Sequence, residues 1–130
     1  MATRVLIVDD ELHVTVALRV KFAKAGYDVT TAMDGREAWE EIQRQPPELM
    51  IADVVMPNVD GFELVKRVRE HPPTADLPVI LLTATAVEQR TRDLAKELNI
   101  AEVVAKPFSI KNVLRSAERL VGQKSSSVGV

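Results

Sequence analysis

The chain has 130 residues, of which 46% are hydrophobic and 28% are charged, and its formal net charge is −2. This length suits one compact domain with a buried core, and the charge balance gives no reason to expect binding to nucleic acid or membranes through bulk charge. The absence of cysteine excludes disulfides and thiolate metal sites. The opening MATRVLIVDD lacks a signal-peptide pattern and no apolar run is long enough to span a bilayer, so we expect a cytoplasmic protein.

Four short apolar runs predict the central strands of a sheet, at residues 5–8, 49–52, 79–82 and 103–105. These runs are continuous rather than alternating, which is typical of parallel strands that are covered on both faces. The segment from Tyr27 to Ala32 alternates and predicts an edge strand.

Helical patterns fill the segments between the strands. The first helix is expected from Glu11 to Ala25, with Gly26 as its left-handed stop, and Asp34, Asp60 and Ser109 are expected to cap three later helices. This alternation predicts an α/β fold with an open, doubly wound, five-stranded parallel sheet in the order 2-1-3-4-5, which is the flavodoxin-like (βα)5 architecture.

Polar side chains stand at the end of each central strand. Asp9 and Asp10 follow the first run, Asp53 the third strand, Thr83 the fourth and Lys106 the fifth. Ligands of open α/β sheets bind outside the carboxyl ends of the strands, and the order 2-1-3-4-5 makes strands 1, 3, 4 and 5 neighbours. We therefore expect these five residues to meet at one edge.

Such a cluster suits phosphoryl chemistry. Three carboxylates repel one another unless a positive charge lies among them, and Mg²⁺ binds carboxylates, water and phosphate oxygens. The Lys106 ammonium and the Thr83 hydroxyl can each hold a phosphate oxygen, and an aspartate can form an aspartyl-phosphate. Taken alone, each residue has a plainer interpretation: the run Asp9-Asp10-Glu11 could cap a helix, and Thr83 or Lys106 could be structural.

Four motifs now carry a family resemblance: LIVDDE at residues 6–11, DVVMPNVDG at 53–61, LLTATA at 81–86 and AKPF at 105–108. In this order and at these spacings they resemble the response-regulator receiver domains of two-component signalling, typified by the bacterial chemotaxis regulator. The resemblance covers nearly the whole chain, from about Arg4 to Val121.

The resemblance implies that Asp53 accepts a phosphoryl group in the presence of Mg²⁺, which Mn²⁺ is expected to be able to replace. It implies that Asp10 binds the metal directly, that Asp9 acts largely through metal-bound water, and that Asp53 and the backbone carbonyl of Val55 complete the protein ligands.

The resemblance also implies that Thr83, Ala84 and Lys106 hold the phosphoryl group and relay its presence, with Asp53 and Lys106 carrying the catalytic chemistry. The Lys106–Pro107 bond matches one that is usually cis in this family. One departure stands out, because Val103 occupies the place of the family's aromatic switch residue, so a threonine–aromatic switch cannot operate here in its usual form.

The resemblance further implies a signalling phospho-acceptor rather than an enzyme. Its expected partners are a histidine kinase or histidine phosphotransfer protein and an unknown downstream protein, with no direct contact to nucleic acid or membrane, and we expect a monomer or weak homodimer. We expect a receiver domain over residues 1–122 and a disordered tail over 123–130. A second apolar row on the first helix, which includes Leu12, Val16 and Val20, is either a docking face for the phosphodonor or a set of scattered surface residues.

Three rival interpretations remain. A dehalogenase-fold hydrolase also uses an aspartate nucleophile with Mg²⁺, but as D-x-D after its first strand. A flavin-binding module needs a phosphate loop rich in serine, threonine and glycine after the first strand, where Asp9-Asp10-Glu11 would repel phosphate. A pseudo-receiver keeps the fold without the chemistry, against which the intact acidic set argues.

Overall fold

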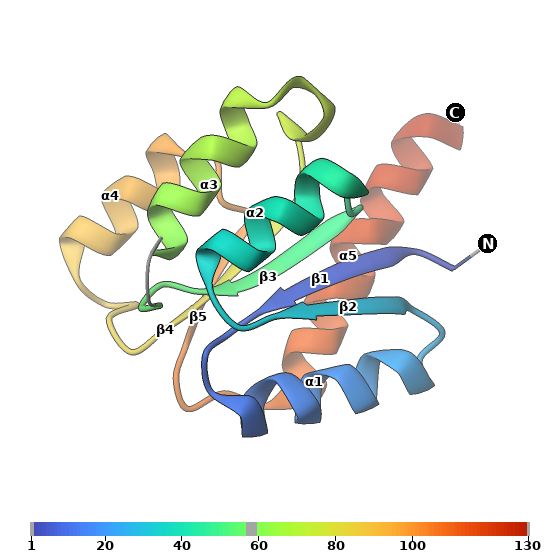
Figure 1. The fold of residues 1–130 in the computed structure, drawn as a ribbon, viewed down its shortest axis with the longest axis horizontal. Helices are drawn as coiled ribbons and strands as arrows, with labels where there is room; N and C mark the ends of the chain where they lie inside the picture. Colours follow the sequence, from blue (N-terminus) through green and yellow to red (C-terminus); the bar gives the residue numbers. More distant parts are fainter. Residues whose placement is uncertain (1, 57–59, 130) are drawn as a thin grey trace.

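The computed structural model describes residues 2–56 and 60–129, and from residue 123 onward it describes the backbone alone. Residues 57–59 of the DVVMPNVDG motif therefore lie outside the described part. Strands and helices alternate along the chain (Figure 1) as β1 (Arg4–Val8), α1 (Leu12–Lys24), β2 (Asp28–Ala32), α2 (Gly35–Arg44), β3 (Leu49–Asp53), α3 (Gly61–Glu70), the short 3-10 helix η1 (Pro72–Thr74), β4 (Val79–Thr83), α4 (Gln89–Glu97), β5 (Glu102–Ala105) and α5 (Ile110–Gly129).

The five strands form a parallel sheet in the order β2-β1-β3-β4-β5. This confirms the predicted fold class and strand order. The register aligns the strand ends, since Val8 pairs with Ala52, Asp53 with Leu82, and Thr83 with Ala105. The residues that follow β1, β3, β4 and β5 therefore emerge at the same edge.

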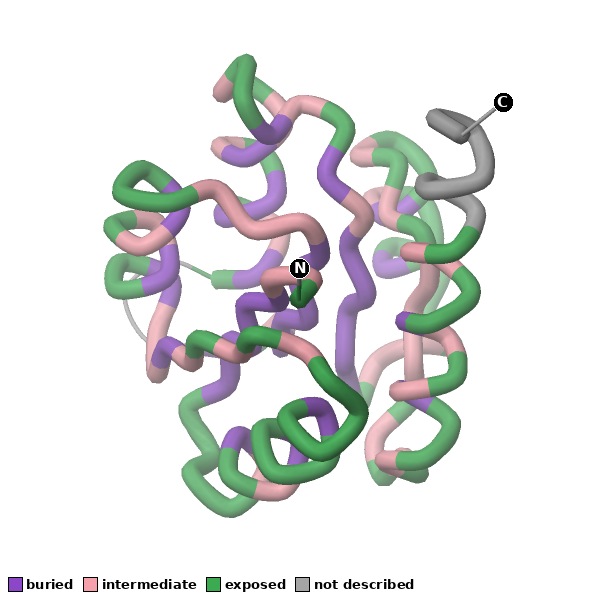
Figure 2. The backbone as a smooth tube through the Cα atoms, turned by 90° about the vertical axis from the view of Figure 1, so that its right-hand side faces the viewer, coloured by how far each residue is buried: buried purple, intermediate pink, exposed green. Residues whose placement is uncertain are grey.

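Helices cover both faces of the sheet, with α1 and α5 on one side and α2, α3 and α4 on the other (Figure 1). Because successive side chains of a strand point to opposite faces, β1 contributes Val5 and Ile7 to the core beneath α1 and α5, and Leu6 and Val8 to the core on the other side. The buried strands form the centre of Figure 2, and the exposed residues lie mostly on the outer helical surfaces. The continuous apolar runs in the sequence follow from this covering on both sides.

The predicted helix ends also form. Gly26 follows α1 with a φ of 97°, the left-handed conformation that glycine adopts readily. Asp34 and Asp60 each accept a hydrogen bond from the backbone N–H three residues later, at 2.8 and 2.9 Å. Ser109 Oγ accepts one from the N–H of Asn112 at 3.3 Å. The backbone of α5 continues to Gly129, and the domain boundary at residue 122 stays a prediction.

Gly61, the first residue of α3, packs directly against the end of β3. Its N–H donates to the Val54 carbonyl at 2.8 Å. A Cβ atom at this position would lie 2.4 Å from the backbone oxygen of Asp53 and 2.8 Å from the Cα of Val54. A glycine here thus lets α3 begin close behind Asp53.

We predict that Gly61→Ala lowers the free energy of unfolding by about 1–3 kcal/mol, the usual cost of overpacking, because the backbone of Asp53 must move. Gly122→Ala is the matched control, since its Cβ would meet nothing within 4 Å, and it should raise stability by up to about 1 kcal/mol through helix propensity. Urea unfolding of the two variants measures both effects. Equal stability of the two variants would contradict this account of Gly61.

Candidate functional site

Two aspartates lie side by side at the carboxyl edge of the sheet. Asp9 directly follows β1, is fully buried, and is fixed by its N–H, which donates to the Ala32 carbonyl at 3.1 Å. Asp53 is the last residue of β3 and is 5% exposed. Because β1 and β3 are neighbours in register, the strands themselves bring the two carboxylates together.

Asp10 completes an acidic cluster with Asp9 and Asp53. One carboxylate oxygen from each of the three lies within 4.8 Å of the others, and Asp10 is the exposed member. Burial raises the pKa of Asp9, and the charge of Asp53 raises it further, against hydrogen bonds from the Glu11 N–H and from Lys106. The three carboxylates therefore repel one another, and a cation bound among them would reduce this repulsion.

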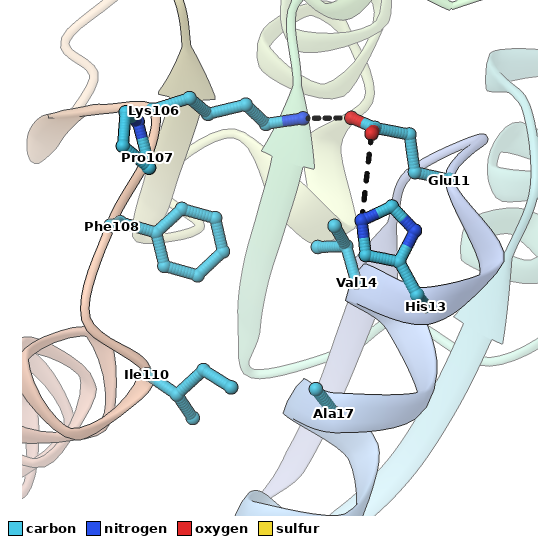
Figure 3. A pocket seen from close by; sticks show the side chains of 8 residues that line it. All are labelled: Glu11, His13, Val14, Ala17, Lys106, Pro107, Phe108 and Ile110. Carbon is cyan, nitrogen blue, oxygen red and sulfur yellow. Dashed lines mark hydrogen bonds and ion pairs between the residues drawn. The ribbon is translucent and has the colours of Figure 1, made fainter.

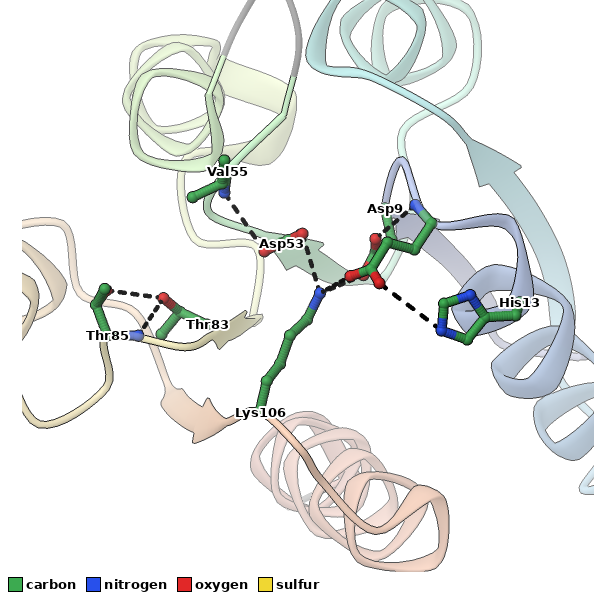
Figure 4. Close-up of polar contacts among 8 residues, drawn as sticks. Asp9, His13, Asp53, Val55, Thr83, Thr85 and Lys106 are labelled. Carbon is green, nitrogen blue, oxygen red and sulfur yellow. Dashed lines mark hydrogen bonds and ion pairs between the residues drawn. The ribbon is translucent and has the colours of Figure 1, made fainter.

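Lys106 lies at the centre of this cluster. Its Nζ donates to Asp53 Oδ2 at 3.0 Å and to Asp9 Oδ2 at 3.1 Å (Figure 4), and to Glu11 Oε1 at 2.8 Å (Figure 3). Burial by itself would lower the pKa of Lys106, but these three hydrogen bonds outweigh burial and raise the pKa above its ordinary value. An ammonium has three N–H groups, so the ammonium donors are all in use.

The backbone of Lys106 is hydrogen-bonded to the end of β4. Its N–H donates to the Thr83 carbonyl at 2.9 Å, directly after the β4–β5 pairing, and the Lys106–Pro107 peptide bond is cis.

Glu11 is a site residue that the motif analysis did not identify. Its carboxylate holds Lys106, which lowers the pKa of Glu11. Glu11 stands at the N-cap position of α1 with an extended backbone, yet its side chain caps nothing. The capping interpretation holds in part for Asp9, whose Oδ1 accepts from the Glu11 N–H at 2.9 Å.

A hollow of about 290 Å³ opens beside the cluster. Val55, with 71% of its surface exposed, lies on its rim, and its N–H donates to Asp53 Oδ1 at 3.4 Å. Ala84 is exposed and also lines the hollow. The lining residues are Asp10, Glu11, Asp53, Val55, Ala84 and Lys106.

Thr83 is placed differently from the other expected phosphoryl-binding residues. It is 1% exposed, and its hydroxyl is hydrogen-bonded to that of Thr85 at 2.9 Å (Figure 4). Val103 on β5 pairs with Leu81 and is half-buried. The side chain of Val103 has neither a ring nor a hydroxyl, and the absence of the usual threonine–aromatic switch stays a prediction.

The residues fit a hard divalent cation. One oxygen from each of three carboxylates lies close enough to the others for all three to bind one ion. Carboxylate oxygens are ligands of the kind that Mg²⁺ prefers, and Lys106 balances only part of their charge. Asp10 and Asp53 both line the hollow, which leaves room for water and for a phosphate oxygen.

Comparison with known proteins identifies the family. The model of the response regulator receiver domain matches residues 5–118. The chain belongs to this family. The receiver fold and its place in two-component signal transduction are thereby established for these residues.

Solved receivers resemble the whole fold. The chemotaxis protein CheY4 of Vibrio cholerae is 32% identical, with a TM-score of 0.85 over 92% of this chain and 98% of that one. The receiver domain of a sensor histidine kinase from Pseudomonas aeruginosa, solved with a magnesium ion in its active-site cleft, is 26% identical, with a TM-score of 0.83 over 94% of this chain and 99% of that one.

Curated relatives are longer proteins. PhoP of Bacillus subtilis, a regulator of alkaline phosphatase synthesis, is 34% identical over 91% of this chain and 51% of its own length. PhoB of Rhizobium meliloti, a phosphate regulon regulator, is 34% identical over 98% of this chain and 56% of its own. The receiver chain thus spans about half the length of these relatives. Among the described residues, no helix combines the length and hydrophobicity needed to cross a bilayer.

Proposed function

We propose that this receiver accepts a phosphoryl group from a phosphohistidine onto Asp53, with a divalent metal held by Asp9, Asp10, Asp53 and the Val55 carbonyl. The observation that carries the proposal is the Asp53 carboxylate, which lines an open hollow while hydrogen-bonded to the Lys106 ammonium. A nearly buried nucleophile beside a fixed cation suits attack on a phosphorus atom whose charge needs neutralising.

In the proposed transfer, an Asp53 carboxylate oxygen forms a bond to phosphorus as the P–N bond of the donor phosphoimidazole breaks. The electron pair of that bond stays on the imidazole nitrogen. Lys106 then holds a phosphoryl oxygen in place of the lost carboxylate charge, Ala84 leaves space at the rim, and the Thr83 hydroxyl donates to another oxygen. Mg²⁺, when bound, neutralises the phosphoryl charge and orients its oxygens.

Other uses of the fold are less well supported. A dehalogenase-fold hydrolase needs its nucleophile after the first strand, whereas the aspartate beside Lys106 and the open hollow here ends β3. A flavin phosphate would meet Asp9, Asp10 and Glu11 at the end of β1. The chain is therefore proposed to act as a signalling phospho-acceptor. Once phosphorylated, it switches the binding of a downstream protein or passes the phosphate onward.

The phosphodonor is proposed to dock on α1. Leu12, Val16 and Val20 form an exposed row on this helix, with 63%, 39% and 45% of their surface exposed. Val14 and Ala17, on another face of α1, line an apolar hollow of about 430 Å³, into which Phe108 and Ile110 project from the opposite wall (Figure 3).

This hollow adjoins the phosphorylation site, because Glu11 and Lys106 line both. A helix packed on α1 could therefore present a histidine to Asp53, which supports a histidine kinase or phosphotransfer domain as the partner.

The metal proposal predicts that magnesium stabilises the fold. At about ten times the dissociation constant, ligand linkage contributes about 1.4 kcal/mol, a rise in Tm of about 3–6 °C for a domain of this size. Asp10→Asn should remove most of this rise, whereas Asp28→Asn, which deletes an equal charge at the start of β2, should keep it. Thermal unfolding with and without Mg²⁺ is the measurement, and an equal rise in both variants would refute the assignment of Asp10.

The phospho-acceptor proposal predicts a gain of one phosphoryl group when the protein is incubated with acetyl phosphate and Mg²⁺. Intact mass should show this gain in the wild type, and chelation of the metal should abolish it. Asp53→Asn should show none, while Asp60→Asn, which removes an aspartate at the α3 cap, should still be labelled. Labelling of folded Asp53→Asn, or none in the folded wild type, would overturn the proposal.

The docking proposal predicts that Val16→Glu together with Val20→Glu slows transfer from a radiolabelled histidine kinase that phosphorylates the wild type, by about tenfold or more, since charges would enter an apolar contact. Labelling by acetyl phosphate should be unchanged, because a small donor needs no such contact. Val87→Glu, at another exposed valine, is the control. Unimpaired transfer to the double variant would show that the row is ordinary surface.

A further inference from the structure

Three threonine hydroxyls connect the phosphorylation edge to the underside of α4. Thr83 Oγ1 is 2.9 Å from Thr85 Oγ1, which is 3.0 Å from Thr91 Oγ1. The Thr85 N–H also donates to Thr83 Oγ1 at 3.0 Å (Figure 4). We refer to Thr83, Thr85 and Thr91 as the hydroxyl chain.

Both ends of the hydroxyl chain are buried. Thr83 ends β4 and is 1% exposed, directly after Leu82, the register partner of Asp53. Thr91 is 3% exposed and, with Ala95, forms the buried face of α4. A buried hydroxyl is costly without a partner, and the hydrogen bond of Thr91 to Thr85 ties α4 to the loop that follows β4.

The valence of a hydroxyl restricts the directions that these hydrogen bonds can take. Each hydroxyl donates one proton and accepts at most two. In the structure as described, either oxygen of each pair can be the donor. If Thr83 donates its proton to a phosphoryl oxygen, it can only accept from Thr85, so the Thr85 hydroxyl must donate to Thr83. Thr85 can then only accept from Thr91.

We propose that Thr91 is a positioning residue for Thr83, and that a phosphoryl group on Asp53 fixes the hydroxyl chain in the single direction Thr91 to Thr85 to Thr83. This inference rests on the proposed function. It adds a route by which a phosphoryl group on Asp53 affects helix α4. The hydroxyl chain connects Thr83 to α4 in a protein in which Val103 cannot act as an aromatic switch.

The coupling must act equally in both directions. If phosphoryl occupancy favours one position of α4, that position of α4 favours phosphoryl binding by the same factor. One neutral hydrogen bond contributes enough for a change of about 2- to 10-fold in affinity. A Thr91 that only fills core space would affect stability without this effect.

Thr91→Val tests the proposal, because it keeps the shape of the side chain and removes the hydroxyl. Thr91→Ser restores the hydroxyl and should rescue the effect. Thr74→Val is the matched control: Thr74 is equally buried, at 2% exposed, but its hydroxyl donates to the Val68 and His71 carbonyls, outside the hydroxyl chain. Should Thr91→Val fail to fold, Thr85→Val breaks the hydroxyl chain at its middle.

The probe is beryllofluoride with Mg²⁺, a mimic of a phosphoryl group on a carboxylate, followed by amide NMR. We expect Thr91→Val to bind it about 2- to 10-fold more weakly and to lose most of the shift response of the α4 amides, while Thr91→Ser and Thr74→Val behave as the wild type. Wild-type behaviour of Thr91→Val, with Val54 and Ala84 amides still responding, would overturn the hydroxyl chain and leave the proposed function standing. No response at those two amides in the wild type would overturn both.

Discussion

The arrangement of the site depends on the ion cluster around Lys106. Asp9, Glu11 and Asp53 each accept a hydrogen bond from its ammonium. Without that cation the strands would bring buried carboxylates together at high cost, since unpaired buried charges are strongly unfavourable. The cation compensates this cost in part, and the cluster retains an excess of negative charge. This excess of negative charge suits the divalent cation that we propose for the edge, and Lys106 offsets part of the repulsion among the carboxylates.

The scaffold supplies the positions that this cluster requires. A sheet covered on both faces fixes the ends of β1, β3, β4 and β5 at one edge, and Gly61 allows α3 to begin against the backbone of Asp53. On the proposed function, Asp53 is a nucleophile at a strand end, and phosphoryl transfer relies mainly on positioning and charge neutralisation. The paired strands and the close packing of α3 at Gly61 therefore contribute to the proposed transfer by positioning the carboxylates.

The sequence predicted the strand ends well, because Asp9, Asp53, Thr83 and Lys106 each follow an apolar run that could be read directly. It did not predict the pairing of Glu11 with Lys106, 95 residues apart, or that of Thr85 with Thr91. Such pairs depend on side-chain directions across elements, for which hydrophobic periodicity carries no signal. The missing aromatic at Val103 could be seen in the sequence. The buried position of Thr91 could not, because threonine is mostly an exposed residue.

Two networks thus lie at the carboxyl edge of the sheet, the ionic one at Asp53 and the hydroxyl chain at Thr83 on the neighbouring strand, and on the proposed function they respond differently to phosphorylation. In the ionic network, the phosphoryl oxygen replaces a carboxylate oxygen as an acceptor for Lys106, so the hydrogen-bond count of the ammonium need not change. In the hydroxyl chain, the hydrogen bond between Thr83 and Thr85 can run in either direction, and a phosphoryl acceptor for the Thr83 proton leaves only one of them. Phosphorylation therefore restricts the hydrogen-bond directions of the neutral network, which leads to α4, while the charged network can keep its number of hydrogen bonds.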